Sequence, residues 1–560
     1  MSLQFITGNS GNGKTKYLFN RIVKEAKANP RDNYLVIVPE QFTMQTQRQL
    51  VDLSENKAIM NIDVLSFKRL AYRVFDELGI TNLTVLEETG KNLVLRKLAA
   101  QEADKLGVIG RNLNRIGYIS EVKSLLSELV QYNISPEELG RYIASGRLSD
   151  TLSDKLKDVL VLYEAFEKFM QDKYITAEEI LNVLCNVADE SAILRNSVIA
   201  FDEFTGFTPI QNQLIKKLFV ISKKIYVTLT IDCREDIFKS RGMQELFDMP
   251  KRTVKSLTEM ASFYGIEVEE PIILDKNYRL AENEEVSFME QQLFRKQRRS
   301  FEKAPKHIHI DCLRDPKQEL TKIARTINEL VRNENLRYRD MAIVTGDVNI
   351  YAGYVREIFD KYNIPYFIDA TQEILFHPFI EFIRSIPDIA AQNFSADAVF
   401  RFLRCGFTEL SDSEIDVLEN YVLACGVRGK SAWDKKWVRL PKHKACYDLE
   451  LLNQSREYII GLLKPVYQVF SDKRSKVKDY VLAIYKLTVL LDIPDKLAKK
   501  EQVLLEAGDQ TASKEYGQIY KIVMQLFEKY VALLGDECMD AEEFTQILDA
   551  GLDAADVAVI

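Results

Sequence analysis

A glycine-rich segment near the N-terminus has the residue types that bind a nucleoside triphosphate. It follows an apolar run at residues 3–7 and matches the pattern G-x-x-x-x-G-K-[ST]. Backbone N–H groups of such a loop surround the β-phosphate, the lysine reaches the β- and γ-phosphates, and the last hydroxyl binds Mg²⁺. A glycine-rich turn without a nucleotide is the alternative. The segment predicts binding of ATP with Mg²⁺ by Gly8, Asn9, Ser10, Gly11, Asn12, Gly13, Lys14 and Thr15.

Two adjacent carboxylates could complete an ATPase site with this segment. Asp202 and Glu203 directly follow an apolar run at residues 197–201. A solvated strand end would be the usual interpretation of such a pair alone. Next to a phosphate loop, we predict that Asp202 binds Mg²⁺ and that Glu203 orients the attacking water. Arg279 follows a polar turn and is a candidate to stabilise charge on the γ-phosphate.

Hydrophobic runs place these residues at the ends of predicted strands. The run at 3–7 precedes the glycine-rich segment, the run at 197–201 precedes Asp202, and a further run covers 224–232. Strands that alternate with helices are typical of a doubly wound parallel sheet, where ligands bind beyond the carboxyl ends of the strands. We therefore expect the phosphate-binding residues and both carboxylates to meet at one edge of an α/β sheet.

Polar residues at the same predicted edge are candidates for contact with a nucleic acid. They follow two further runs, at residues 34–38 and 62–64. Ordinary roles as loop residues and helix caps are the alternative for each of them. The candidates are Gln41, Thr43, Ser66 and Lys68.

Composition limits the class of protein. The 560 residues are 46% hydrophobic and 28% charged, which excludes collagen-like and wholly disordered chains. Charged residues interrupt every apolar run well before the length of a membrane span, and no leader pattern is present, so we expect a cytoplasmic protein without a membrane partner. Seven scattered cysteines and four histidines argue against a metal cluster within the chain. With a net charge of -8, any nucleic-acid binding must use local patches.

The second half begins with a pattern of alternating strands and helices and continues as helix. A basic segment at 295–306 is interpreted as a linker between domains. The period of 3.6 residues dominates from about 378 to 545, and also from about 86 to 192. A second α/β unit is predicted from strands at 307–310, 341–344 and 366–368 and helices at 317–331 and 350–360.

Both tryptophans fall in a basic segment at residues 428–444. Bases could stack on such rings while the cations contact phosphates. The alternative is that the rings anchor helix packing beside a solvated basic face. The candidates for contact with DNA are Arg428, Lys430, Trp433, Lys435, Lys436 and Trp437.

The order of these motifs resembles the core of superfamily 1 (UvrD-like) DNA helicases. The phosphate loop, the strand ending in Asp202 and Glu203, and the segment with Arg279 resemble motifs I, II and IV of that superfamily. The sequence is more similar to the AddB family, one of the two kinds of chain that form the AddAB helicase-nucleases. This resemblance is carried by residues 38–43, 64–71, 204–209, 338–343 and 418–424.

The resemblance implies an α/β fold with two RecA-like domains, each carrying a helical insertion. It implies a subunit that binds MgATP and DNA, pairs with an AddA-type helicase/nuclease subunit, and acts on double-stranded DNA ends and single strands in recombinational repair. The expected parts are a first RecA-like domain at 1–85 and 193–295, its insertion at 86–192, a second RecA-like domain at 296–377 and 546–560, and its insertion at 378–545.

Three departures from the superfamily pattern qualify these expectations. Residues 231–234 replace the usual Gly-Asp-x-x-Gln of motif III, and only seven residues precede Gly8, where an adenine-reading glutamine usually stands. We therefore expect a scaffold or strand-reading subunit with weak or no autonomous motor activity, and whether ATP is hydrolysed stays open. Family members are about twice as long, so their C-terminal nuclease and its iron-sulfur cluster are expected outside this sequence. An autonomous helicase and a non-enzymatic interaction protein with a relic phosphate loop are the alternatives.

Overall fold

The chain forms two compact units. Unit 1 comprises Met1–Leu86, Leu125–Tyr142 and Phe169–Asp311, and unit 2 comprises Glu87–Ser124, Ile143–Lys168 and Cys312–Ile560. The predicted division into two RecA-like domains and two helical insertions stays a prediction. The structure is a computed structural model, and it describes residues 1–80, 85–108, 118–145, 148–171, 174–295, 299–368, 372–374, 376–441, 447–472, 474–553 and 556–557.

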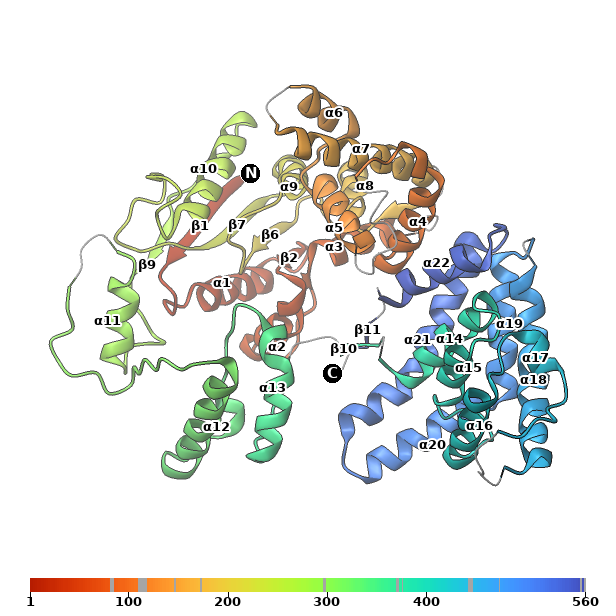
Figure 1. Cartoon of the computed structure of the whole chain (residues 1–560). Coiled ribbons are helices and arrows are strands. Elements are labelled where there is room, and N and C mark those ends of the chain that lie inside the picture. Colours follow the sequence, from red (N-terminus) through yellow and green to blue (C-terminus); the bar gives the residue numbers. More distant parts are fainter. Residues whose placement is uncertain are drawn as a thin grey trace. The chain divides into compact units, whose positions relative to one another are not determined.

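A parallel sheet forms the centre of unit 1 (Figure 1). Its strand order is β3-β2-β6-β7-β1-β8, and β9 also pairs with β1. Every pairing in this sheet is parallel, which confirms the α/β class, and the five strands predicted for this part of the chain are present as β1, β2, β3, β6 and β7. The strands are β1 (Ser2–Gly8), β2 (Tyr34–Ile37), β3 (Ile62–Leu65), β6 (Val198–Phe201), β7 (Lys224–Thr230), β8 (Glu267–Val268) and β9 (Ile272–Leu274).

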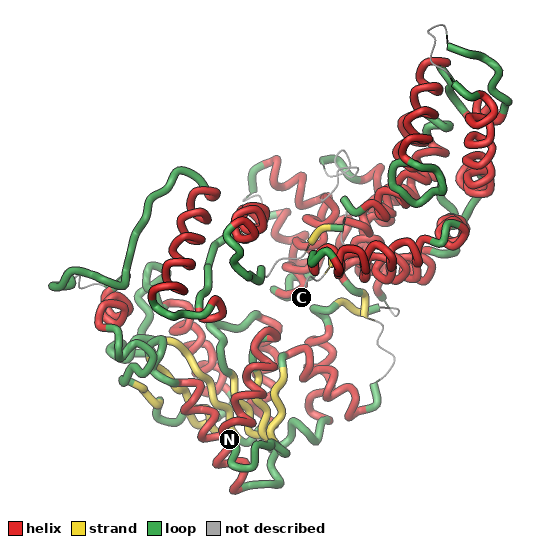
Figure 2. The backbone as a smooth tube through the Cα atoms, turned by 90° about the horizontal axis from the view of Figure 1, so that it is seen from below, coloured by secondary structure: helices red, strands yellow, loops and turns green. Residues whose placement is uncertain are grey.

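Helices cover both faces of this sheet, because alternate strand residues enter two separate hydrophobic cores. Phe5 and Ile199 belong to one core and pack with helices α3 (Phe67–Leu78), α8 (Ile180–Val187), α9 (Pro209–Ile221) and α10 (Asp248–Phe263). Ile6 and Ala200 belong to the other and pack with α1 (Lys14–Ala28) and α2 (Thr43–Leu53). Burial on both faces explains the nearly continuous apolar runs of these strands. Figure 2 shows the strands side by side within unit 1.

Unit 2 is built mainly of helices, as the 3.6-residue period after residue 378 predicts. One large core unites helices from residues 378 to 553 and includes Leu93 of α4 (Glu88–Gln101). The other helices of this region are α14 (Pro378–Ala391), α15 (Ala396–Leu403), α16 (Asp412–Cys425), α17 (Lys430–Asp434), α18 (Leu449–Ser471), α19 (Val477–Leu490), α20 (Ile493–Glu506), α21 (Gln510–Leu534) and α22 (Ala541–Asp553). The short strands β10 (Gln372–Glu373) and β11 (Asp556–Val557) pair antiparallel.

In its described residues, the region expected to be helical between 86 and 192 contains further α-helices besides α4 and α8. These are α5 (Tyr118–Gln131), α6 (Pro136–Ala144) and α7 (Asp150–Met170). Two-residue strands, β4 (Val85–Leu86) and β5 (Ile175–Thr176), pair in parallel near its ends. Within the part of the chain that the structure describes, no helix combines the length and the apolar composition that crossing a membrane requires.

The strands predicted for a second α/β unit are wrong. Helices α12 (Pro316–Asn333) and α13 (Val348–Lys361) form as predicted and pack together around Leu320 and Phe359. In the described structure, however, residues 307–310, 341–344 and 366–368 belong to no strand. Ile310 and Val344 are each 94% exposed, so their apolar side chains are not buried as those of a sheet strand would be. A second RecA-like domain therefore stays a prediction.

Candidate nucleotide-binding site

The loop between β1 and α1 has a backbone that requires glycine. Gly11 and Gly13 have φ values of +87° and +79°, in the left-handed region. A Cβ atom on Gly11 would lie 2.9 Å from Oδ1 of Asn277 and from Cβ of Arg279. The carbonyl of Gly11 accepts the backbone N–H of Tyr278 at 3.0 Å. Residues 277–279 therefore lie directly against the loop, as a role of Arg279 at the phosphate site requires.

Helix α1 starts at this loop with free backbone donors. Its N-cap is Gly13, which offers no side-chain cap to the first N–H groups of the helix. Uncapped N–H groups and the helix dipole favour an anion at this end. Lys14 Nζ donates to the carbonyls of Gly8 at 3.1 Å and Asn9 at 3.0 Å. Burial lowers the pKa of Lys14, while Glu203 and Asp202 act in the opposite direction.

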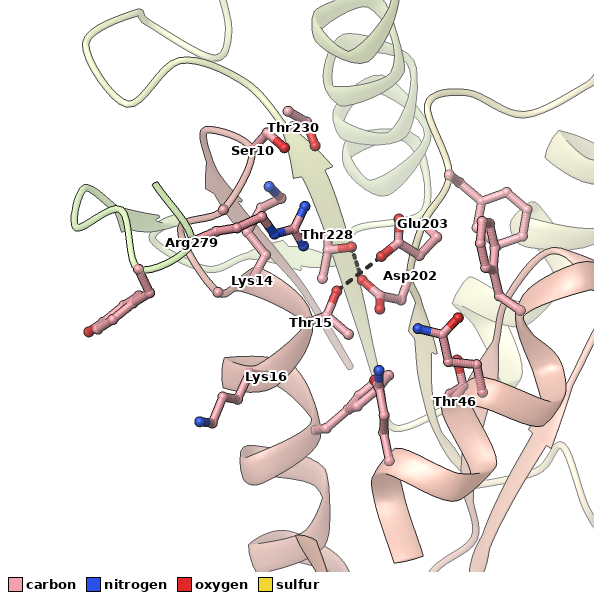
Figure 3. A pocket seen from close by; sticks show the side chains of 18 of the residues that line it. Ser10, Lys14, Thr15, Lys16, Thr46, Asp202, Glu203, Thr228, Thr230 and Arg279 are labelled. Carbon is pink, nitrogen blue, oxygen red and sulfur yellow. Dashed lines mark hydrogen bonds between the residues drawn. The ribbon is translucent and has the colours of Figure 1, made fainter. Parts of the chain in front are cut away.

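The two predicted carboxylates lie beside this helix start (Figure 3). Asp202 follows β6 and is 1% exposed, and Thr228 on the neighbouring strand β7 donates to its Oδ1. Its other carboxyl oxygen, Oδ2, is buried and has no hydrogen-bond partner among the residues that the structure describes. Burial raises the pKa of Asp202 to about 6. Thr15 Oγ1 donates to Glu203 Oε1 at 3.3 Å, so residues nearly two hundred positions apart meet at one point.

A single cavity of about 690 Å³ joins these groups. This volume lies within the usual range of small-molecule sites. It is lined by all four residues predicted to act in metal binding or catalysis, Thr15, Asp202, Glu203 and Arg279, and by the predicted phosphate-binding residue Lys14. Sequence reasoning missed further lining residues from α2, β7 and the segment before Arg279, which are Gln45, Thr46, Gln49, Thr228, Thr230 and Tyr278.

Two of these omissions had a signal in the sequence. Thr228 lies two residues before the end of β7, and the parallel register places β7 beside β6, so its side chain could reach Asp202. Tyr278 directly precedes the predicted Arg279. Its ring lies 3.5 Å from the Cβ position of Gly13 and is otherwise exposed. The residues of α2 had no comparable signal, because their approach depends on helix packing.

The oxygen atoms in the cavity fit a magnesium ion. Mg²⁺ prefers carboxylate and hydroxyl oxygens and retains several waters. Thr15 Oγ1, the unpartnered Oδ2 of Asp202 and the carboxylate of Glu203 provide such ligands in one place. A buried carboxyl oxygen without a hydrogen-bond partner needs an explanation, and a bound cation would provide one, so Asp202 Oδ2 is the candidate metal ligand at this position.

The polar candidates at the carboxyl edge of β2 and β3 divide into two kinds. Thr43 and Ser66 are buried and fill local roles. Thr43 Oγ1 donates to the carbonyl of Glu40 at 2.9 Å, and Ser66 caps α3 by accepting the N–H of Arg69 at 3.3 Å. Gln41 and Lys68 are exposed, and of the four they alone can reach a nucleic acid without rearrangement.

The expectation that bases stack on the tryptophans is wrong. Trp433 and Trp437 are 0% and 6% exposed in the core of unit 2, with ring centroids 5.2 Å apart. Tyr421 stacks on Trp437 at 5.1 Å, and Trp437 Nε1 donates to the carbonyl of Ala432 at 3.0 Å. The rings are helix-packing anchors, the alternative that the sequence left open. Among their basic neighbours, Lys430 pairs with Asp434 at 2.6 Å, whereas Arg428, Lys435 and Lys436 are exposed.

Comparison with known proteins agrees with this geometry. The family model described as "ADDB, N-terminal" matches residues 5–290, which include the whole cavity described above. The chain is 38% identical, over its full length, to the B subunit of the ATP-dependent helicase/deoxyribonuclease of Lachnoclostridium phytofermentans, and it covers 49% of that protein. Identity is 30% to the protein of the same name from Acetivibrio thermocellus and 31% to that from Caldanaerobacter subterraneus, again over 100% of the chain.

The chain spans about half the length of the curated relatives it matches, with 50% and 49% coverage of the last two. The family model itself covers a little more than half of the chain, from residue 5 to residue 290. Because this match holds the phosphate loop, both carboxylates and Arg279, the chain belongs to the AddB family.

Proposed function

We propose that this chain is the helicase-like part of an AddB-type protein and that it binds MgATP in the cavity beside β1 and β6. The observation that carries this proposal is the convergence of Lys14, Thr15 and Asp202 with Glu203 and Arg279 on one cavity. Each provides a different function that triphosphate binding needs, and three distant parts of the sequence supply them. Structural ion pairing alone does not explain the set, because Asp202 has no cation partner within the described residues.

Each side chain has a distinct role in this proposal. Lys14 and the free N–H groups at the start of α1 bind the phosphates, and Thr15 and Asp202 hold the metal. Bound Mg²⁺ neutralises charge on the phosphate oxygens. Glu203 lies within hydrogen-bond reach of Thr15 and can orient a water toward the γ-phosphate. Arg279, fixed against Gly11, stabilises the negative charge that develops there.

Substitution of the lysine tests the site directly. Lys14→Ala should raise the dissociation constant for Mg-ATP by at least about a hundredfold, since it removes the cation that contacts the phosphates. The matched control is Lys24→Ala, because Lys24 is an exposed lysine on the same helix. Titration calorimetry measures both variants. Equal affinity of Lys14→Ala and the unmodified protein would remove the site assignment.

In the proposed complex, the chain is a scaffold and strand-reading subunit rather than an independent motor. The name of the relatives describes one subunit of a larger enzyme, which implies a partner chain, and we propose an AddA-type helicase/nuclease in the cytoplasm. Their name also implies action on DNA, and we propose broken duplex ends and the single strands made from them. Gln41 and Lys68 follow β2 and β3 and are exposed, so a DNA strand could contact their side chains. Residues 231–234 lack the motif that couples ATP to movement in related helicases.

An autonomous helicase is the second candidate, and the retained pair of Asp202 and Glu203 favours it. It predicts DNA-stimulated ATP turnover by the isolated chain that disappears in Glu203→Gln while nucleotide binding persists. The scaffold proposal predicts low turnover in the isolated chain and no unwinding without the partner chain. A relic loop predicts no nucleotide binding at all. Steady-state turnover with and without single-stranded DNA separates the autonomous helicase from the scaffold, and titration calorimetry with Mg-ATP separates both from a relic loop.

A further inference from the structure

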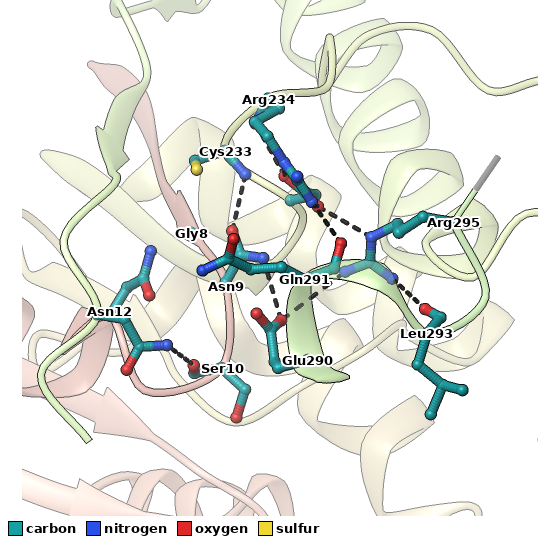
Figure 4. Close-up of polar contacts among 12 residues, drawn as sticks. Gly8, Asn9, Ser10, Asn12, Cys233, Arg234, Glu290, Gln291, Leu293 and Arg295 are labelled. Atoms are coloured by element: carbon teal, nitrogen blue, oxygen red, sulfur yellow. Dashed lines mark hydrogen bonds and ion pairs between the residues drawn. The ribbon is translucent and has the colours of Figure 1, made fainter. Parts of the chain in front are cut away.

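One side chain of the phosphate loop is hydrogen-bonded to two segments far away in the sequence (Figure 4). Asn9 is 5% exposed. Its Oδ1 accepts the backbone N–H of Cys233 at 3.0 Å, and its Nδ2 donates to Glu290 Oε1 at 3.0 Å. Its carbonyl accepts from Lys14 Nζ at 3.0 Å. Asn9 therefore connects the lysine of the phosphate site with the loop after β7 and with helix α11 (Glu284–Gln292).

A buried ion pair completes this connection. Arg295 Nε donates to Asp232 Oδ2 at 2.9 Å, and their side chains are 10% and 1% exposed. The same guanidinium lies 3.7 Å from Glu290 Oε1 and 4.7 Å from the ring centroid of Phe247. Arg234, from the loop after β7, also binds Asp232, with Nε at 2.8 Å. Because Asp232 directly precedes Cys233, these contacts form a closed ring, which we call the Asn9 ring: Asn9, Glu290, Arg295, Asp232 and the N–H of Cys233.

The Asn9 ring occupies a position that can transmit a change in the phosphate loop. Asp232 follows the end of β7, whose Thr230 pairs with Gly8 at the start of that loop. Glu290 belongs to α11, and Arg295 lies just after this helix, in the segment that leads to Asp311, the last residue of unit 1. A shift of the loop must therefore either break hydrogen bonds of Asn9 or move α11 with it. Buried charge pairs are poorly screened, so their geometry is held firmly.

We propose that the Asn9 ring positions the phosphate loop and couples nucleotide binding to the order of α11. The inference rests on the proposed nucleotide site. Glu290, Arg295 and Asp232 are positioning residues, because they act on the loop through Asn9. Coupling of this kind is reciprocal: a nucleotide that favours one loop conformation also favours the intact ring, and loss of the ring weakens binding.

The test compares nucleotide affinity in single and double variants of the full chain. Arg295→Ala should raise the dissociation constant for Mg-ADP by about tenfold, within the usual range of coupling between sites. Asn9→Ala should have a similar effect, and the double variant should add little, because both changes open the same ring. Arg295→Lys should recover part of the affinity, since it keeps the charge near Asp232 and Glu290.

Lys251→Ala is the matched control. Lys251 is also in unit 1, is 3% exposed and pairs with Glu235 at 2.6 Å and Glu245 at 3.3 Å. Lys251→Ala therefore removes a buried, paired cation that lies outside the Asn9 ring. Each variant is measured at a temperature where its circular dichroism shows a folded chain. The control should lower thermal stability and leave the affinity for Mg-ADP within twofold of the unmodified protein.

Hydrogen exchange provides a second readout, which a merely structural role would not change. Mg-ADP should slow exchange of the amides in α11 in the unmodified protein, and Asn9→Ala should remove this protection. The inference is overturned if Arg295→Ala binds normally, if Lys251→Ala binds as weakly as Arg295→Ala, or if α11 is protected equally in Asn9→Ala. Absence of any Mg-ADP binding in the unmodified protein would refute the nucleotide site and this inference with it. Binding that is lost in Lys14→Ala but normal in Arg295→Ala refutes the ring alone.

Discussion

Asp202 and Asp232 provide a matched pair for testing the electrostatics of the site. Both follow neighbouring parallel strands, β6 and β7, and both are 1% exposed. Asp232 is surrounded by two guanidinium groups, whereas Asp202 accepts one hydroxyl and has one oxygen without a partner. Burial therefore raises the pKa of Asp202, from 3.8 to about 6. For Asp232, burial is outweighed by the hydrogen bonds from Arg234 and Arg295, which hold its pKa well below the usual range.

The sign of the effect on stability follows from the direction of each shift. A carboxyl group whose pKa is raised by folding destabilises the folded state once it is ionised, so its cost is absent at low pH and grows as the pH rises from 3.8 to about 6. The shift corresponds to about 3 kcal/mol when complete, at about 1.4 kcal/mol per pKa unit. At about pH 5, roughly half of this cost is present. Asp202→Asn should therefore stabilise unit 1, and more strongly at pH 8 than at pH 5.

Hydrogen exchange in a urea series, without Mg²⁺ or nucleotide, measures this difference in the amides of β6. Comparison of variant and unmodified protein at the same pH removes the intrinsic dependence of exchange on pH. Both tryptophans of the chain, Trp433 and Trp437, lie in unit 2, so their fluorescence follows a unit that the substitution should not affect. The expected gain is about 3 kcal/mol at pH 8 and roughly half of that at pH 5.

Asp232→Asn is the control with the opposite sign. The lowered pKa of Asp232 means that its ionised form stabilises the fold above the ordinary pKa of an aspartate, and that this contribution is lost as the pH falls through the folded-state pKa. The substitution should therefore destabilise unit 1 at pH 8. A loss of stability in both variants, or a gain from Asp202→Asn that is equal at pH 5 and pH 8, would refute the electrostatic reasoning.

Four other predictions concern the loop, the metal, a helix cap and the tryptophans. Nucleotide binding in the presence of Mg²⁺ should weaken about tenfold per pH unit below about pH 6, as Asp202 becomes protonated; calorimetry that shows no pH dependence would contradict this. Gly11→Ala should abolish nucleotide binding in the same assay, because its Cβ would lie 2.9 Å from Asn277 Oδ1. Thr208→Ala removes the cap of α9 and should lower the free energy of unfolding of unit 1 by about 1 kcal/mol in urea. Trp433→Ala should destabilise unit 2 by about 3–5 kcal/mol and leave DNA affinity unchanged where the unit is folded; selective loss of DNA binding would support base stacking instead.

The parallel sheet of unit 1 and its helices could be predicted from sequence because several local signals agree there. The apolar runs before Gly8 and Asp202 are buried on both sides of a sheet, so they are continuous, and the glycine pattern fixes the loop that follows. The carboxyl ends of parallel strands share one edge, and this rule alone places Thr15 near Glu203. The order of the strands in the sheet is not a local property of the sequence. Only the strand pairing in the structure shows that β7 lies between β6 and β1.

The second half lacked this agreement of signals. Short apolar segments such as 341–344 have the composition of a strand, but a strand also requires a neighbour that supplies hydrogen bonds, and composition does not report one. Trp433 and Trp437 are surrounded by lysines in sequence, although their rings point into the core while the lysines remain in solvent. Trp433 lies in α17, which has only 5 residues, so hydrophobic periodicity could not show whether its ring faces the core or the solvent.

The contrast between the two aspartates also explains why only one of them suits a metal. The carboxylate of Asp232 accepts two hydrogen bonds from the Arg234 side chain, one from its backbone N–H and one from Arg295, so its oxygens have no capacity left. Within the described part of the chain, Asp202 Oδ2 has no hydrogen-bond partner, and Asp202 lines the same cavity as Lys14 and Thr15. In the roles proposed above, the same residue type at the ends of adjacent strands thus serves a ligand in one case and the position of the phosphate loop in the other. Asn9 accepts from Lys14 through its backbone carbonyl, and its side chain bonds Glu290 and the N–H of Cys233, the residue after Asp232, so a single residue links the surroundings of Asp232 with the candidate phosphate site.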